Sequence, residues 1–234
     1  MRIALLGYGK MGKVIEKIAL NRGHEIVLTK DNSNTFEGLL NADVAIDFSI
    51  PYCAVDNITE CLNNNIPIVS GTTGWLENYK KVEQLCIEKN GSFIYSSNFS
   101  LGVNLFFKLN EDLAKMMRKF NQYQVKISEI HHTQKLDAPS GTAISLANKI
   151  IDNSNYRSWT LDSKVQENEI FIEAERKENI PGTHHVNYSS QVDSIEIIHT
   201  AHSREGFALG AVIAAEWLIN KKGIFSMNDV LELN

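Results

Sequence analysis

The stretch RIALLGYGKMGKVIEKIALNRGHEIVLT, residues 2–29, decides the fold class. A short apolar run leads into Gly7, Gly9 and Gly12 in G-x-G-x-x-G spacing, and a helical apolar period then precedes a second apolar run. A strand, a glycine turn, a helix and a strand in this order form the context in which the spacing indicates a dinucleotide site. The glycines allow a tight turn and a close approach of backbone to phosphate, although a purely steric use of them is the alternative.

The end of the second predicted strand bears on the identity of the dinucleotide. Asp31 follows the last glycine at close to the ~20-residue spacing at which a carboxylate binds the adenosine ribose hydroxyls. Its neighbour Lys30 could instead attract a 2′-phosphate. We therefore expect NADH or NADPH as the cofactor, with a preference for NADH.

Strand and helix patterns alternate through the first hundred residues. This alternation predicts a parallel, doubly wound sheet, whose ligands lie beyond the carboxyl ends of the strands. Three polar turns fall at that edge and together favour one cofactor cleft, although each alone is ordinary turn chemistry. They are DFSIP (47–51), SGTTG (70–74) and SSNFS (96–100).

The pattern changes after residue 100. A helical period over 101–120 is followed by strand-like segments that predict an open, largely antiparallel sheet. The last apolar helix, within 206–221, is expected to return to the first domain. The predicted fold is α/β, with a doubly wound domain at 1–100, on which 208–234 packs, and a mixed-sheet α+β domain at 101–207.

The composition excludes several classes of protein. A net charge of −5 argues against a nucleic-acid platform, which needs a basic face. No apolar run approaches the roughly 18 to 20 residues that span a bilayer, and the first residues lack the cleavage site of a secretory signal. Three cysteines without metal-ligand spacing indicate reduced thiols. We expect a cytoplasmic protein that binds neither nucleic acid nor membranes.

The polar stretch EIHHTQKLDAPSGTA, residues 129–143, carries the chemistry-bearing side chains of the second domain. Ser140, Gly141 and Thr142 have the pattern of a helix start, where free amides and the helix dipole favour a carboxylate or phosphate. Lys135 adds a cation, and His131 and His132 titrate near neutrality. Adjacent strand residues point to opposite faces, so periodicity alone leaves the role of each histidine open.

Other titratable residues have weaker patterns. Asp137 is interpreted as a turn residue or as the partner of Lys135. Three further histidines could suggest zinc, but their spacing and the lack of nearby cysteine pairs disfavour it, and we expect no metal: His184, His185 and His199. The residues alone thus predict a small anionic substrate with a general acid nearby.

The same stretch resembles the signature of the 4-hydroxy-tetrahydrodipicolinate reductase (dihydrodipicolinate reductase) family. Six further segments resemble the family in its order: GYGKMG, DFSIP, GTTG, SSNFSLGVN, IPGTHHV and HTAHSREGFALGA. The resemblance implies a Rossmann domain for NADH or NADPH and a mixed-sheet domain for substrate binding and oligomerisation. It also implies a homotetramer that reduces 4-hydroxy-tetrahydrodipicolinate, a small dicarboxylate, in the diaminopimelate route to lysine.

Residue roles follow from the resemblance position by position. His131 is the implied proton donor and Lys135 its catalytic companion, while His132, Ser140, Gly141 and Thr142 are implied to bind the substrate. The implied cofactor-binding residues are Gly7, Tyr8, Gly9, Lys10, Met11, Gly12, Asp31, Gly71, Thr72, Thr73, Ser96, Ser97, Asn98 and Phe99. Asn32 and Thr200 stand where the family often has arginine; the first weakens the case for a 2′-phosphate.

Two alternatives from other classes are open. A different Rossmann oxidoreductase, such as an amino-acid reductase, would lack the stretch at 129–143. A non-catalytic NAD-sensing protein could keep GYGKMG but would not need His131 and Lys135 together. Turnover of the hydroxy-tetrahydrodipicolinate substrate separates both from the reductase.

Overall fold

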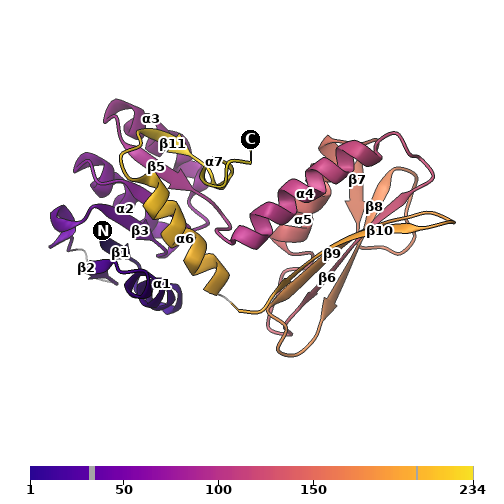
Figure 1. Ribbon diagram of the computed structural model, residues 1–234, viewed down its shortest axis with the longest axis horizontal. Coiled ribbons are helices and arrows are strands. Elements are labelled where there is room, and N and C mark those ends of the chain that lie inside the picture. Colours follow the sequence, from indigo (N-terminus) through magenta and orange to yellow (C-terminus); the bar gives the residue numbers. More distant parts are fainter. Residues whose placement is uncertain (32–34, 204, 234) are drawn as a thin grey trace. The chain divides into compact units, whose positions relative to one another are not determined.

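The computed structural model describes residues 1–31, 35–203 and 205–233. The chain divides into two compact units, residues 1–101 with 205–234, and residues 102–204. The prediction made for Asn32 lies outside the described residues. Figure 1 labels the elements of each unit.

The first unit contains a six-stranded sheet in the order β11-β5-β4-β3-β1-β2 with every pairing parallel. The order reverses between β1 and β3, which makes that edge a topological switch point where ligands of such sheets bind. The strands are β1 (Arg2–Leu6), β2 (Glu25–Lys30), β3 (Val44–Asp47), β4 (Ile68–Ser70), β5 (Ser92–Tyr95) and β11 (Gly223–Phe225). The helices are α1 (Lys10–Asn21), α2 (Pro51–Asn63), α3 (Tyr79–Glu88), α6 (Glu205–Leu218) and α7 (Met227–Val230), with 3-10 turns at Leu39–Asn41 and Leu76–Asn78.

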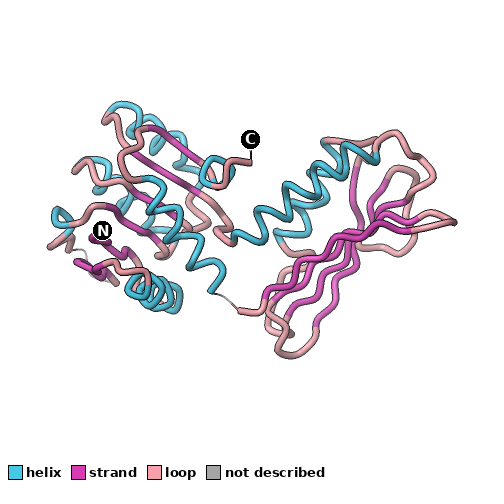
Figure 2. The backbone as a smooth tube through the Cα atoms, in the orientation of Figure 1, coloured by secondary structure: helices cyan, strands magenta, loops and turns pink. Residues whose placement is uncertain are grey.

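Helices cover both faces of this sheet (Figure 2). Alternate side chains of β1 face different helices. Ile3 and Leu5 belong to an apolar cluster with α1 and α6, whereas Ala4 and Leu6 belong to a second cluster with α2 and α3. Parallel strands buried on both faces are apolar along their length, as residues 3–6 of β1 and 44–46 of β3 are. The predicted doubly wound sheet is confirmed.

Helix α6 brings the end of the chain back to this sheet. A methyl group at Gly210 would lie 1.7 Å from the carbonyl oxygen of Phe99, so glycine allows the helix to approach the segment after β5. Beyond the end of α1, the Arg22 guanidinium lies 2.7 Å from the Glu216 carboxylate of α6. None of the helices formed by the described residues is long and apolar enough to cross a membrane.

The second unit contains a five-stranded sheet in the order β10-β9-β6-β8-β7. Its strands are β6 (Gln124–His131), β7 (Ser158–Thr160), β8 (Glu169–Arg176), β9 (Gly182–Ser189) and β10 (Ser194–Ala201). The sheet is mixed: β9 pairs antiparallel with β6 and β10, whereas β8 pairs parallel with β6 and β7. The expectation of a largely antiparallel sheet is therefore wrong for β7 and β8, because α5 returns the chain from β6 to β7 in the parallel direction and the loop 161–168 returns it again from β7 to β8.

Helices α4 (Leu101–Met117) and α5 (Gly141–Asp152) lie along one face of this sheet (Figures 1 and 2). The face is apolar toward the start of β6, where Val125 and Ile127 pack with Leu146 of α5. At the other end of β6 the same face carries Glu129 and His131, which are also buried. The core thus gives way to a buried polar cluster where β6 ends and α5 begins.

Candidate functional site

In the glycine turn after β1, packing of the fold requires two of the three glycines but not the third. A methyl group at Gly7 would lie 2.2 Å from the Phe48 carbonyl oxygen, and Gly7 has a φ of +103°. A methyl group at Gly12 would lie 2.2 Å from the Gly7 carbonyl oxygen. At Gly9, by contrast, nothing lies within 4 Å of such a group. Packing therefore explains Gly7 and Gly12, whereas the bare backbone at Gly9 leaves space for a ligand.

Helix α1 begins at this open position. Gly9 is its N-cap and provides no side-chain cap, and the first turn carries no acidic residue. The first amides of a helix lack intrahelical acceptors and are partially positive, so they favour an anion. The turn fits the pyrophosphate of a dinucleotide, with Gly9 and the α1 amides as the groups that would hold it. Tyr8, also predicted here, donates its hydroxyl to Glu16 at 2.5 Å.

The end of β2 lies beside this turn, because the Gly7 amide donates to the Lys30 carbonyl at 2.8 Å. Asp31 follows directly and is exposed. The Lys30 side chain is buried, with its ammonium 4.8 Å from the centre of the Phe36 ring. Of these two adjacent residues, Asp31 therefore presents its charge to solvent, whereas the Lys30 ammonium lies against Phe36 inside the protein.

A buried carboxylate joins the next two loops of the predicted cleft. Asp47, at the end of β3, accepts hydrogen bonds from Ser49, Asn57, Ser70 and Thr72 at 2.7 to 2.9 Å. Burial raises the pKa of Asp47, and these donors oppose the rise. The Thr72 hydroxyl also accepts from the Ser49 amide at 2.8 Å. Thr72 was predicted to bind the cofactor, but its hydroxyl fixes the loop.

The remaining residues that were predicted to bind the cofactor differ in whether their side chains can reach a ligand. Gly71 has a packing role, since a methyl group there would lie 2.3 Å from the Phe48 ring. Phe99 is a core residue, 1% exposed, so its side chain does not face a ligand. The Ser96 hydroxyl forms a local turn with the backbone of Asn98. Four other predicted side chains are exposed or half-buried: Lys10, Met11, Thr73 and Ser97.

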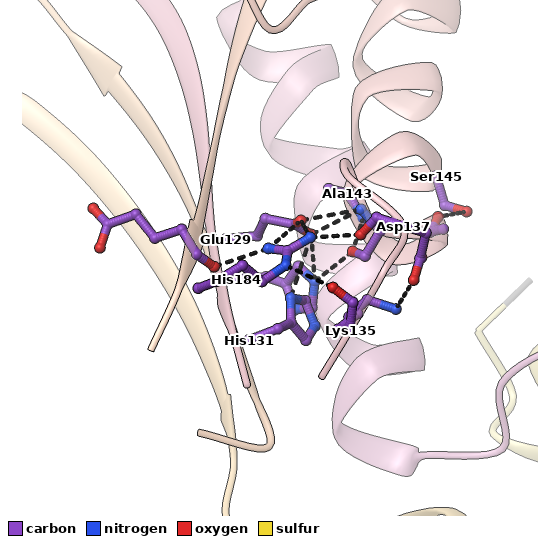
Figure 3. A network of polar contacts seen from close by, with 11 residues as sticks. Glu129, His131, Lys135, Asp137, Ala143, Ser145 and His184 are labelled. Atoms are coloured by element: carbon purple, nitrogen blue, oxygen red, sulfur yellow. Dashed lines mark hydrogen bonds and ion pairs between the residues drawn. The ribbon is translucent and has the colours of Figure 1, made fainter. Parts of the chain in front are cut away.

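The second unit brings three titratable residues together at the end of β6 (Figure 3). Glu129 and His131 point to the same face of β6 because they are two residues apart, and His184 of β9 joins them. The Nδ1 atom of His131 and the Nε2 atom of His184 each lie 3.6 Å from Glu129 Oε2. The His131 and His184 rings meet edge to face at 5.0 Å.

Glu129 is fully buried, and its carboxylate accepts hydrogen bonds from two groups. The Ser140 amide donates to both of its carboxylate oxygens, at 3.1 and 3.0 Å. The Arg176 guanidinium donates to Oε1 at 3.2 Å. Burial alone would raise the pKa of Glu129, but the interactions with His184 and Ser140 outweigh it and lower the pKa to about 2. Glu129 is therefore a carboxylate at neutral pH.

His131 lies against the backbone of β9. A methyl group at Gly182 would lie 3.0 Å from its Nε2, so the glycine makes room for the ring. Burial is the main reason that the pKa of His131 is lowered to about 4. The interaction with His184 and the charges of Lys135 and Arg176 lower this pKa further, whereas Glu129 opposes them. In this state the His131 ring is neutral at pH 7.

Lys135 lies in the loop between β6 and α5 and forms an ion pair with Asp137 at 2.8 Å. This confirms the interpretation of Asp137 as its partner, and Lys135 is the main cause of the lowered pKa of Asp137. His132, the next residue after His131, borders a hollow of about 500 Å³ formed with residues 178–181. The hollow has room for a small ligand.

The predicted helix start is confirmed at α5. Ser140 is the N-cap, and its hydroxyl accepts from the Ala143 amide at 3.2 Å and meets His184 Nε2 at 3.1 Å. Ser140 is 3% exposed, so its hydroxyl serves the cap and the polar cluster. Nothing lies within 4 Å of a methyl group placed at Gly141. The amides of Gly141 and Thr142, in the first turn of α5, therefore have no acceptor within the helix.

Sequence reasoning did not assign roles to Glu129, Arg176, Gly182 and His184. The alternation of side chains along β6 could have placed Glu129 beside His131, because the two are separated by one residue. His184, Gly182 and Arg176 reach the cluster through strand pairings that the sequence does not reveal. Their contribution depends on the register of β8 and β9.

The cluster also has the composition of a metal site. Among the described residues, one ligand atom each from Glu129, His131 and His184 lies within 4.8 Å of the others. The Arg176 guanidinium already neutralises Glu129 from the other side. We therefore interpret the cluster as a buried polar network around a carboxylate whose charge is already compensated.

Comparisons with known proteins assign both units to one family. Residues 1–99 match the family described as "Dihydrodipicolinate reductase, N-terminus", and residues 102–231 match "Dihydrodipicolinate reductase, C-terminus". A 4-hydroxy-tetrahydrodipicolinate reductase from Christiangramia forsetii is 57% identical over 99% of this chain and 98% of its own. A relative of the same name from Thermosipho africanus is 36% identical over 99% of this chain and 98% of its own.

A solved structure has the same fold. The dipicolinate-bound dihydrodipicolinate reductase from Paenisporosarcina sp. TG-14 aligns with a TM-score of 0.79 over 97% of both chains. Its sequence identity to this chain is 22%, so the likeness supports the architecture alone.

Proposed function

Because this chain belongs to the dihydrodipicolinate reductase family, we propose that it binds a nicotinamide cofactor at the Gly9 turn and its dicarboxylate substrate beside His131 and Lys135. The reaction is the reduction of 4-hydroxy-tetrahydrodipicolinate to tetrahydrodipicolinate in the diaminopimelate route to lysine, in which the ring gains a hydride and a proton and the 4-hydroxyl leaves as water. The observation that carries the site assignment is the polar cluster at the end of β6. There a buried histidine, a lysine and a capped helix start occur together.

The substrate carries two carboxylates, and the second unit offers two kinds of group that can bind one of them. Lys135 supplies a mobile cation that can leave the half-exposed Asp137 carboxylate. The amides of Gly141 and Thr142 supply donors at the positive end of α5. Because these groups lie on one loop and the helix that follows it, they can grip one carboxylate together and orient the ring.

When bound, the nicotinamide supplies the hydride that adds to the electrophilic carbon of the substrate. His131 supplies the proton that accompanies the hydride. Its Nδ1 faces Glu129, which leaves Nε2 as the nitrogen that can meet the substrate. The Glu129 carboxylate stabilises the imidazolium, and the negative charge of an incoming dicarboxylate raises the low pKa of His131. His131 thus becomes charged when there is a substrate to protonate.

The surroundings of β2 support a preference for NADH. Asp31 is exposed where the adenosine ribose hydroxyls are expected, and a carboxylate repels a 2′-phosphate. The Lys30 ammonium, the cation that could have attracted that phosphate, lies against Phe36 inside the protein. We therefore propose that kcat/KM with NADH exceeds the value with NADPH.

One assay tests both proposals. Purified protein is mixed with freshly generated 4-hydroxy-tetrahydrodipicolinate and either reduced cofactor, and oxidation of the cofactor is followed by its absorbance. We expect turnover with a higher kcat/KM for NADH. Absence of turnover with both cofactors would contradict the reductase function, and a preference for NADPH above about tenfold, or about 1.4 kcal/mol, would contradict the role of Asp31.

We also propose a homotetramer in the cytoplasm. The edge strand β10 and the turn before it expose apolar side chains, with Ile198 58% and Val192 88% exposed. Such an edge favours pairing with another copy of the sheet. Light scattering coupled to size-exclusion chromatography measures the mass directly. A monomeric mass at working concentration would contradict the proposal.

A further inference from the structure

We propose that Arg176 and Glu129 are positioning residues, which hold the loop of Lys135 and the start of α5 in the arrangement that binds the substrate carboxylate. The inference rests on the proposed function, because it assigns these two residues to the same substrate site. Neither residue needs to touch the substrate. Each acts through the backbone of the segment that does.

Arg176 ends β8 and holds the loop at two points. Its Nε donates to the carbonyl oxygen of Lys135 at 3.3 Å, and its Nη2 donates to that of Asp137 at 2.5 Å. Residues 132–140 contain no helix or strand, so their position depends on such anchors. Both carbonyl groups belong to the residues of the ion pair. The guanidinium therefore fixes the backbone from which the Lys135 ammonium extends.

Glu129 connects the same guanidinium to the helix. It accepts from Arg176 through Oε1 and from the Ser140 amide through both oxygens. Ser140 is the N-cap of α5, so this contact fixes the residue directly before the Gly141 and Thr142 amides. The ion pair between the buried Glu129 and the half-buried Arg176 thus joins the end of β6, the end of β8, the loop and the helix start.

The geometry requires an arginine at this position. The planar guanidinium has five N–H donors in a fixed fork, and here it serves Glu129, two loop carbonyls and the Glu175 carbonyl at 2.8 Å. A lysine ammonium is a single point with three donors and cannot span these acceptors. The substitution Arg176→Lys would keep the charge beside Glu129 but release the loop. It therefore separates the electrostatic contribution of Arg176 from its positioning role.

The test measures binding of pyridine-2,6-dicarboxylate, a stable dicarboxylate probe, and of NADH to Arg176→Lys, Arg176→Met and Glu129→Gln. Lys177→Met is the matched control, because the exposed Lys177 pairs with Glu175 at the surface of the same strand end. We expect the three variants to bind the probe about tenfold or more weakly, with NADH affinity and the control unchanged. Melting curves identify any variant that fails to fold; Arg176→Lys, which keeps the buried charge paired, is the decisive one.

A double-mutant comparison tests whether Arg176 acts through Lys135. In a Lys135→Ala background, Arg176→Lys should weaken probe binding less than it does in the wild type, because one of the groups that it positions is gone. A folded Arg176→Lys protein with wild-type probe affinity, or a fully additive double variant, would overturn the inference. Turnover by the wild-type protein tests the proposed function separately. Absence of that turnover would contradict the proposed function and would be distinguishable from either binding result.

Discussion

The Lys135 ammonium lies 2.8 Å from the Asp137 carboxylate, in a pair formed within one loop. Asp137 is 59% exposed, so water screens the attraction and the pair contributes little to the stability of the fold. Under the proposed function, a substrate carboxylate therefore replaces Asp137 beside Lys135 at a small cost. The Lys135 charge is paired with Asp137 in the free protein, and the proposed substrate would take the place of that carboxylate.

Asp137→Asn tests this exchange. Because removing the competing carboxylate frees Lys135, we expect pyridine-2,6-dicarboxylate to bind more tightly, by up to about fivefold, with an unchanged melting temperature. Isothermal titration measures the affinity. Weaker binding would mean that Asp137 orients Lys135 for the substrate.

The glycine turn provides a matched pair of substitutions. Gly9→Ala places a methyl group in open space, so the protein should fold normally but bind NADH about tenfold or more weakly, because the methyl group occupies the approach of the phosphates. Gly12→Ala forces a contact with the Gly7 carbonyl and should cost about 2 kcal/mol or more of unfolding free energy. Denaturant unfolding and NADH titration distinguish the two effects. Equal stability losses would contradict the assignment of Gly9 to the ligand.

Gly182→Ala addresses the space beside His131. The added methyl group lies 3.0 Å from Nε2 and should displace the ring, lowering kcat by about tenfold while NADH affinity is unchanged. Steady-state kinetics in wild-type and His131→Gln backgrounds isolate the cause. The substitution should have little further effect once His131 is absent, and an equal loss in both backgrounds would place its action elsewhere.

The low pKa of His131 predicts proton uptake on binding. The ring has a pKa of about 4 in the free protein and is neutral at pH 7, and a bound dianion raises this pKa. Binding of pyridine-2,6-dicarboxylate near pH 6 should therefore take up as much as about one proton, and less as the pH rises. Calorimetry in buffers of different ionisation enthalpy measures the uptake. His131→Gln should abolish it, and uptake that persists in that variant would assign the proton to another group.

The local parts of the site could be predicted from the sequence. The glycine turn and the N-cap at Ser140 follow from residues close together in the chain, and the structure has both. Strand β11 was missed because it has three residues and pairs with β5, more than a hundred residues earlier. Its stability comes from that partner rather than from its own pattern.

The non-local parts could not be predicted in the same way. Arg176 reaches Glu129 because β8 runs parallel to β6, and the sequence had indicated a largely antiparallel sheet. Phe99 and Thr72 lie in segments that resemble the family, yet the side chain of one is in the core and that of the other binds Asp47. A motif gives the position of a residue in the chain, whereas packing decides which of its atoms face a ligand.

We propose that His131 and Lys135 carry the chemistry of the second unit. The most direct measurement is kcat with NADH and 4-hydroxy-tetrahydrodipicolinate for His131→Gln and Lys135→Ala, with NADH affinity measured alongside. We expect kcat to fall by ~10² or more in each variant, since a general acid contributes on that scale, while NADH affinity remains that of the wild type. Near-normal kcat in both variants would contradict the account.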